Sequence, residues 1–366
     1  MDQRSGALRN QGDDRRLSLM TPKEIFLAGL RRQPSPRPAT GSATSVVTTD
    51  LMDVASAGFP EAHLDAEKMA ALAAAGHTVL GFDNIMPLFS VWHESAALGC
   101  EVDWGDRGHM PTGRPCCSGI EASLAVPADF LLRSPCAVPL EAIRWLKRRY
   151  GDDVAIVGKA FGPWTLGYHV YGIEEFLVST LTRPDAVKRA MRTLLEVTVT
   201  FASAQLDSGA DALSLPDHCT RDLCSPAAYR DFLRELHQEL HERIRGPVIL
   251  HICGDTSDRL AYIRETGLEC FHFDSKVPAA DARRLAGERL ALMGGTSNFT
   301  VVRSGTPEII AREVQEKLAA HIDILGPECA VPLDAPWANL KALAEQAKRS
   351  SAGETKPSSV CGHRSR

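Results

Sequence analysis

The sequence has no apolar run of the roughly 18 residues needed to cross a bilayer, and residues 1–20 contain no apolar segment typical of a secretory signal. It also has no long basic run in its body, and its 41 Lys and Arg are outnumbered by 46 Asp and Glu. This balance argues against electrostatic binding of nucleic acid. We therefore expect a cytoplasmic protein that binds neither nucleic acid nor a membrane.

The chain also lacks Gly-x-Gly-x-x-Gly, and no phosphate-binding pattern follows the glycine pair Gly294–Gly295. A chain of 366 residues buries a core large enough to be stable without disulfides. Its ten cysteines, in a reducing compartment, are therefore packing residues, metal ligands or reactive thiols. The question is which of them are metal ligands or reactive thiols.

The two ends of the chain differ in composition from its body. Residues 1–19 are polar without an apolar period, and we expect a disordered extension. Thr21, Pro22 and Glu24 then supply the cap, first-turn proline and capping-box carboxylate of a helix. Residues 348–366 are serine-rich and basic, which predicts a second disordered tail in which Cys361 has no chemical role. One domain is expected over residues 20–347.

Within this body, short β-type runs alternate with amphipathic helical patterns, which indicates parallel strands. Eight such runs favour a single (β/α)8 TIM barrel, an α/β fold, over an open sheet. Residues 84–150 are too long for one repeat, and we expect an insertion over the barrel mouth with a hairpin around Gly105. The predicted strands are 43–47, 78–82, 154–159, 212–215, 248–253, 270–273, 290–294 and 328–331.

Barrels bind ligands at the carboxyl ends of their strands, and these ends are rich in charge and metal-binding side chains. His251 and Cys253 are two residues apart on one predicted strand, so their side chains point to the same face, and Cys329 lies in the last predicted strand. One His and two Cys suit zinc and leave a fourth position open. The alternative is ordinary packing of a buried His beside a buried Cys, and the pattern alone leaves the two readings even.

The remaining cysteines favour less specific explanations. A second metal cluster could involve His218, Cys219 and Cys224, but a polar loop is the commoner explanation for such a segment. Cys116 and Cys117 are adjacent and face different ways, which argues against joint chelation. We expect the eight cysteines other than Cys253 and Cys329 either to contribute only to packing or to have no role.

Several motifs together resemble the uroporphyrinogen decarboxylase superfamily, and most closely its methylcobamide:coenzyme M methyltransferase branch. The resemblance runs from Met20 to Leu343, nearly the whole body. Its motifs are His251-Ile-Cys-Gly-Asp-Thr, Asp274-Ser-Lys-Val, Leu292-Met-Gly-Gly, Cys329-Ala-Val-Pro-Leu-Asp-Ala-Pro-Trp, Met20-Thr-Pro-Lys-Glu, Phe59-Pro-Glu-Ala-His, Lys68-Met-Ala, Ala75-Gly-His and Leu98-Gly-Cys-Glu-Val-Asp.

The resemblance implies a (β/α)8 barrel with zinc bound by His251, Cys253 and Cys329. It also implies methyl transfer from a methylated corrinoid to a thiol such as coenzyme M, with another thiol or a folate left open as acceptor. Because the chain lacks the Asp-x-His-x-x-Gly loop of corrinoid-binding modules, a separate corrinoid protein is the expected partner.

Other residues have more general expected roles at this site. One acidic residue is expected to fill the fourth zinc position or accept the thiol proton, and three basic residues are expected either to bind a sulfonate or to form salt bridges. The acidic candidates are Glu94, Asp217 and Asp274, and the basic ones are Lys159, Arg114 and Lys276.

Two other functions remain open from the sequence. A decarboxylase-like enzyme acting on a tetrapyrrole is disfavoured because the chain lacks the Arg-Gln-Ala-Gly-Arg-Tyr signature near its amino terminus. A non-catalytic partner that handles corrinoids is the third reading.

Overall fold

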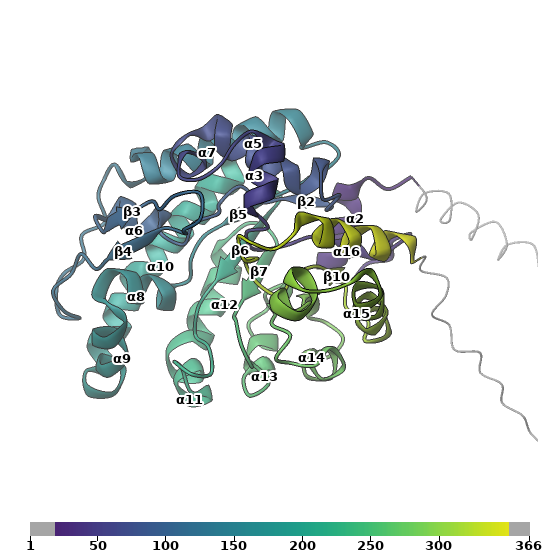
Figure 1. Ribbon diagram of the computed structural model, residues 1–366. Coiled ribbons are helices and arrows are strands. Elements are labelled where there is room, and N and C mark those ends of the chain that lie inside the picture. The colour runs from purple at the N-terminus through teal and green to yellow at the C-terminus, as the bar shows by residue number, and fades with distance from the viewer. Residues whose placement is uncertain (1–18, 351–366) are drawn as a thin grey trace, which may run out of the picture.

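The computed structural model describes residues 19–350, in which eight parallel strands form a barrel surrounded by helices (Figure 1). The strands are hydrogen-bonded in the order β1-β10-β9-β8-β7-β6-β5-β2. This arrangement confirms the predicted (β/α)8 barrel. The strands are β1 (Ala39–Thr40), β2 (Asn84–Ile85), β5 (Ala155–Lys159), β6 (Ala212–Pro216), β7 (Val248–His251), β8 (Cys270–Phe273), β9 (Ala291–Gly294) and β10 (Ile324–Leu325).

Helices fill the outer layer and the loops at the carboxyl ends of the strands. They are α2 (Pro22–Leu30), α3 (Thr49–Ala55), α4 (Glu61–Leu64), α5 (Ala66–Thr78), α6 (His93–Leu98), α7 (Ser134–Tyr150), α8 (Pro163–Tyr171), α9 (Ile173–Thr182), α10 (Pro184–Asp207), α11 (Pro226–Ala228), α12 (Arg234–Arg243), α13 (Leu260–Arg264), α14 (Ala279–Ala286), α15 (Pro307–Ala319) and α16 (Trp337–Arg349), with short helical turns η1 (Phe130–Leu132), η2 (Tyr229–Leu233) and η3 (Asn298–Arg303).

The seam between β1 and β2 closes the barrel largely through side chains. One backbone bond crosses it, from the Asp83 N–H to the Thr40 carbonyl at 2.8 Å. Beside it, the buried amide of Asn84 accepts from the Ser42 N–H at 3.0 Å and donates to the Ser42 carbonyl at 2.9 Å. A Cβ on Gly41 would lie 2.2 Å from Asn84 Oδ1, so the close approach requires glycine there.

The predicted first helix begins as expected. The Thr21 hydroxyl accepts from the Glu24 N–H at 3.2 Å, and the Glu24 carboxylate accepts from the Thr21 N–H at 2.8 Å. This reciprocal capping box starts α2 at Pro22. Helix α2 and the last helix, α16, both contact β1.

Five of the eight predicted strands match observed ones closely, but three predictions were wrong. The run 43–47 is a loop after β1, because the Ser42 hydroxyl bonds to the Thr44 backbone and replaces a strand ladder. The run 78–82 begins at the last residue of α5 and continues as the turn that ends the helix, where the Leu80 N–H still donates to the Ala75 carbonyl. The run 328–331 is a loop that follows β10: the Glu328 N–H makes one more bond to the Thr296 carbonyl at 2.9 Å, and the Val331 N–H then donates to the Ser45 carbonyl in another loop.

Strand β7 is also shorter than predicted. It ends at His251, so Cys253 lies in the following loop and not on the strand. The argument that both side chains point to one face of a strand therefore does not hold for Cys253. Loop geometry positions this thiol instead.

The predicted insertion contains the expected hairpin, β3 (Glu101–Asp103) paired antiparallel with β4 (Thr112–Arg114). Gly105 has φ of +75°, and a Cβ there would lie 2.2 Å from the His109 carbonyl oxygen, so the turn requires glycine. The insertion is shorter than predicted. Its last part, α7, belongs to the outer layer and contacts α5, α10 and β5.

The predicted domain end at residue 347 falls two residues before the end of α16. Lys348 is held in place, because its ammonium donates to the Gly81 carbonyl and lies 3.4 Å from the Asp83 carboxylate. The predicted extension over residues 1–18, and residues 351–366 of the predicted tail with Cys361, lie outside the described residues.

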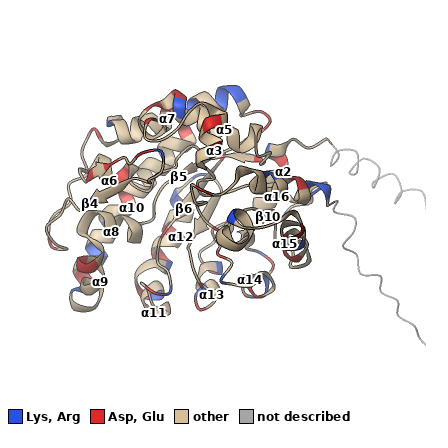
Figure 2. Ribbon diagram, in the orientation of Figure 1, with Lys and Arg blue, Asp and Glu red and all other residues tan. Residues whose placement is uncertain are grey.

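Acidic and basic segments are interspersed over the outer helices (Figure 2). Within residues 19–350, no helix combines the length and the apolar composition needed to cross a membrane.

We expect Asn84→Ala to lower the free energy of unfolding by about 2–4 kcal/mol, because it leaves the buried N–H and carbonyl of Ser42 without partners. Urea unfolding monitored by circular dichroism measures this change. Gln33→Ala removes an amide from an exposed side chain and is the matched control. Equal unfolding midpoints for the two variants would contradict a closing role for Asn84.

Candidate metal centre

Three side chains converge at the carboxyl end of the barrel. His251 is the last residue of β7, Cys253 follows in the next loop, and Cys329 lies in the loop after β10. His251 Nε2 is 3.1 Å from Cys253 Sγ, which is 3.2 Å from Cys329 Sγ. These ligand atoms all lie within 4.8 Å of one another. The structure therefore brings together the three residues that the sequence pointed to.

A backbone hydrogen bond orients the imidazole of His251. The ladder between β7 and β8 pairs His251 with His272, and His251 Nδ1 lies 3.1 Å from the His272 carbonyl oxygen. A carbonyl can only accept, so Nδ1 carries a proton, and Nε2 is the ring atom that faces the sulfur of Cys253. A backbone carbonyl behind a histidine is the usual outer partner in protein metal sites.

The ring of His272 connects His251 to the loop that carries Cys329. Its Nε2–H donates to the Pro327 carbonyl at 2.8 Å, two residues before Cys329, and its ring lies 4.6 Å from that of His251. Burial, and then the charge of His251, lower the pKa of His272 to about 3, so the ring is neutral. A Cβ on Gly294 would lie 2.4 Å from this ring, which explains the need for glycine at that position.

Sequence reasoning missed the role of His272. It lies inside an apolar run that we assigned to a buried strand, and its position opposite His251 depends on the strand register. The available signal was a lone polar residue among Cys270, Phe271 and Phe273.

The two sulfurs share one proton. The hydrogen bond between them lowers the pKa of Cys329 well below its ordinary value and raises that of Cys253, because one sulfur is stabilised as the thiolate acceptor. Burial opposes protonation of His251, but the charge and hydrogen bond of Cys329, together with the His272 carbonyl and the charge of Asp274, outweigh burial and raise the pKa of His251. A soft divalent cation would replace these shared protons.

Two acidic residues hold the loops around the sulfurs. Asp274 accepts from the Gly254 N–H at 2.8 Å and so fixes the residue after Cys253. Glu328, beside Cys329, accepts from the N–H groups of Ser275 and Asn298 at 3.0 and 2.8 Å. Glu328 was not among the residues predicted for the site. Asp274 was predicted as catalytic, and the contacts described here make it a support for the ligand loop.

A buried lysine and a buried glutamic acid lie between the hairpin insertion and the sulfurs. Lys159, at the end of β5, is 3% exposed, and burial lowers the pKa of its amine to about 8, against the opposing charges of Glu94 and Cys329. Glu94 Oε1 accepts from the Phe161 N–H at 2.7 Å, while Oε2 is buried without a partner. Burial raises the pKa of Glu94 to about 7. Both groups therefore titrate near neutral pH, which is common in functional sites.

The carboxylate of Asp217 bonds to helices α8 and α12. It accepts from the Thr165 N–H at 2.8 Å and lies 3.1 Å from His237 Nε2, so it joins the first turn of α8 to α12. A Cβ on Gly162 would lie 2.3 Å from Asp217 Cγ. These contacts occupy the carboxylate of Asp217, and the catalytic role predicted for it stays a prediction.

The other two predicted basic residues lie at the surface. Arg114 ends β4 with its side chain 82% exposed, and it lies 3.9 Å from Glu101. Lys276 is exposed, and its backbone N–H donates to Asp274 at 2.9 Å. Only Lys159 among the three predicted basic residues is buried near the sulfurs.

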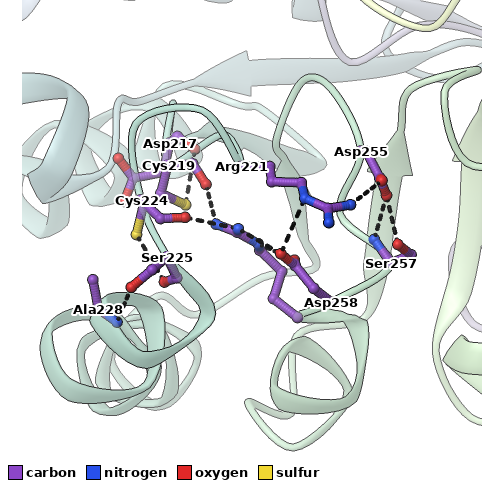
Figure 3. Close-up of polar contacts among 10 residues, drawn as sticks. Asp217, Cys219, Arg221, Cys224, Ser225, Ala228, Asp255, Ser257 and Asp258 are labelled. Carbon is purple, nitrogen blue, oxygen red and sulfur yellow. Dashed lines mark hydrogen bonds and ion pairs between the residues drawn. The ribbon is translucent and has the colours of Figure 1, made fainter.

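A buried arginine holds the loop that carries His218, Cys219 and Cys224, which we considered, as the less favoured reading, for a second metal cluster. Arg259 donates to the carbonyls of Cys219 and Cys224 at 2.6 and 2.7 Å, and its Nε lies 2.8 Å from Asp258. Figure 3 shows Arg221 extending this connection to the neighbouring loop. Among residues 19–350, the triad is the only group of three or more potential metal ligands, so Cys219 and Cys224 belong to a structural loop.

Comparison with known proteins places this barrel in a family. The model of the uroporphyrinogen decarboxylase family (URO-D) matches residues 21–350. The chain therefore belongs to the uroporphyrinogen decarboxylase family.

Within this family, the full-length relatives are methyltransferases. The chain is 30% identical to a methylcobamide:CoM methyltransferase of Methanosarcina barkeri over 89% of this chain and 97% of that protein. It is 31% identical to a methylated-thiol--coenzyme M methyltransferase of Methanosarcina mazei, over 91% and 90%. A solved methyltransferase structure from Methanosarcina mazei superposes with a TM-score of 0.87 at 31% identity, covering 90% of this chain and 99% of that one. The predicted resemblance to the methylcobamide:coenzyme M methyltransferase branch is confirmed.

We expect Lys159→Met to raise the free energy of unfolding by about 3 kcal/mol at pH 7, because the native state then no longer buries an ammonium. The pKa of Lys159 falls from 10.5 in the unfolded chain to about 8 in the native state. Between these values the unfolded chain binds more protons, so wild-type stability rises with pH and the advantage of the variant shrinks. Urea unfolding of both proteins from pH 7 to 10.5 tests this, and a pH-independent difference would contradict it.

Proposed function

We propose that the protein transfers a methyl group from a methylated corrinoid, carried by a separate corrinoid protein, to a thiol such as coenzyme M. The observation that carries this proposal is the convergence of His251, Cys253 and Cys329 at the barrel mouth. The names of the full-length relatives support the same reaction. In this reaction the thiolate attacks the methyl carbon, a carbon–sulfur bond replaces the carbon–cobalt bond, and the corrinoid keeps the electron pair.

The triad fits zinc by its donor set. One imidazole lone pair and two sulfurs that share one proton form a soft, partly deprotonated site, and His251 is already fixed in the tautomer that offers Nε2. When bound there, zinc stabilises the acceptor sulfur as a thiolate near neutral pH. Asp274 and the ring of His272 support the two ligand loops from behind, which keeps the three donors in place.

Lys159 and Glu94 provide the charge and the proton acceptor beside this site. The ammonium of Lys159 favours an anion in the mouth, either the acceptor thiolate or a sulfonate at its far end. Glu94 has a pKa of about 7 and a free carboxyl oxygen, which suits it to accept the proton that the thiol releases. Of the three acidic candidates, we therefore assign proton transfer to Glu94, loop support to Asp274 and no chemical role to Asp217.

Two aromatic side chains of the insertion shield the mouth beside these groups. Trp92 stacks on His169 with 4.1 Å between ring centroids, and Trp104 packs against His93 at 5.3 Å. This cover limits the access of water to Glu94, the next residue after His93. A dry mouth strengthens the attraction between Lys159 and an anionic acceptor.

We expect Cys253→Ala and Cys329→Ala to lose stoichiometric zinc and at least about 99% of thiol-dependent demethylation of methylcobalamin, because two ligands do not hold the cation. Elemental analysis and the absorbance change of the corrinoid measure the two effects. Cys116→Ala removes an exposed thiol and is the control.

These measurements also separate the alternatives. Full zinc content and activity in both variants would overturn the proposed site. Wild-type protein without zinc that decarboxylates a tetrapyrrole would favour the decarboxylase reading, and zinc-loaded protein without turnover would favour a non-catalytic corrinoid partner.

We expect Lys159→Gln to raise KM about tenfold for 2-mercaptoethanesulfonate and less than about twofold for uncharged 2-mercaptoethanol, because it removes the buried cation that faces the acceptor. Arg114→Gln, at the exposed position, should leave both values unchanged. Steady-state kinetics with methylcobalamin measure all four values. Equal increases for both thiols would show that Lys159 does not recognise the sulfonate.

A further inference from the structure

The loop that carries Cys329 is held from the neighbouring loop after β9. Pairing between these two loops continues one step beyond the strands, where Thr296 forms a bridge with Pro327. At this bridge the Glu328 N–H donates to the Thr296 carbonyl at 2.9 Å. Cys329 is the next residue, so it lies just past the last backbone bond that joins the two loops.

The side chain of Asn298, the first residue of η3, continues this connection. Its amide Nδ2 donates to the Ala330 carbonyl at 2.9 Å. Its backbone N–H donates to the Glu328 carboxylate at 2.8 Å. A single residue of the β9 loop therefore contacts both neighbours of Cys329, Glu328 on one side and Ala330 on the other.

These two contacts affect the position of the Cys329 sulfur. The direction of a side chain follows from the backbone on either side of its Cα. Cys329 Sγ lies 3.2 Å from Cys253 Sγ, and both belong to the group of three potential ligands. Release of the Ala330 side of the loop would therefore change the distance between the two sulfurs.

Packing alone does not explain an asparagine at position 298. The side chain is 4% exposed, and its Oδ1 is buried without a hydrogen-bond partner among residues 19–350. An unpaired buried amide oxygen lowers stability, so an amide is a costly way to fill this space. The contact that offsets this cost is the bond from Nδ2 to the backbone beside Cys329.

We propose that Asn298 is a positioning residue for the metal centre and that it acts by holding Cys329 where the cation is bound. This role rests on the proposed zinc site, to which it adds a residue that acts through the backbone of the ligand loop. Replacement of such outer residues typically weakens metal binding by about 10- to 100-fold.

A second asparagine provides a matched control. Asn339, in α16, donates through its Nδ2 to the carbonyls of Val302 and Gly305 at 3.1 and 3.0 Å. These two contacts hold the far end of η3 and the turn after it, whereas the amide of Asn298 holds the Cys329 loop. Alanine at either position removes side-chain bonds to backbone carbonyls, but only one of the two changes affects the ligand loop.

The zinc affinity of the full-length protein tests the proposal. Metal-free wild type, Asn298→Ala and Asn339→Ala are titrated with Zn²⁺ in competition with a chromophoric chelator, and urea unfolding verifies that each variant is folded. We expect Asn298→Ala to bind zinc at least about tenfold more weakly than wild type, and Asn339→Ala to bind it within about twofold of wild type.

An isosteric variant and a second cation give independent readouts. Asn298→Asp keeps the shape of the side chain but cannot donate to the Ala330 carbonyl when ionised. By charge alone the added carboxylate would strengthen cation binding, so weaker zinc binding in this variant identifies the lost donor as the cause. With saturating Co²⁺, the thiolate-to-cobalt absorbance should change in Asn298→Ala and stay as in wild type in Asn339→Ala.

The role assigned to Asn298 is wrong if Asn298→Ala binds zinc within about twofold of wild type, or if both alanine variants lose affinity equally. Tighter zinc binding by Asn298→Asp would contradict it as well. Wild-type protein that binds no zinc would overturn the proposed metal site and this role with it, which separates that failure from a wrong assignment of Asn298 alone.

Discussion

The hydrogen bond from His251 Nδ1 to the backbone of His272 determines what the barrel mouth can do. It exists because β7 and β8 pair in a register that sets these two residues side by side. A shift of this register would turn the imidazole lone pair away from the sulfurs. The same histidine at β8 uses its ring to hold Pro327, near Cys329, so one strand pair positions both His251 and the loop of Cys329.

Much of the fold could be predicted from the sequence because the central strands are apolar and regular. The run 270–273 matches β8 to the residue, and the hairpin around Gly105 follows from a glycine that a tight turn needs. The first and last strands were misplaced because each is two residues long, too short for a periodic pattern. The apolar runs near them, which were predicted as strands, lie instead at the end of α5 or in loops.

The sequence predicted some residues of the site and missed others. His251, Cys253 and Cys329 were found through their chemistry and family motifs, although Cys253 lies off the strand. His272 and Glu328 act through register and loop contacts, which no local pattern encodes. The sequence left the role of Asp217 open, because a carboxylate at a strand end can point outward to cap a helix as readily as inward to a substrate.

The seam between β1 and β10 has a consequence for how the chain reaches this fold. Ala39 pairs with Ile324, so the first strand finds its ladder partner only when nearly the whole domain has been synthesised. Until then, both β1 and the growing sheet present open edges, and closing such a long loop slows folding. Strand β1 thus keeps one edge open until the last strands are made, and an open edge of this kind favours pairing with other chains.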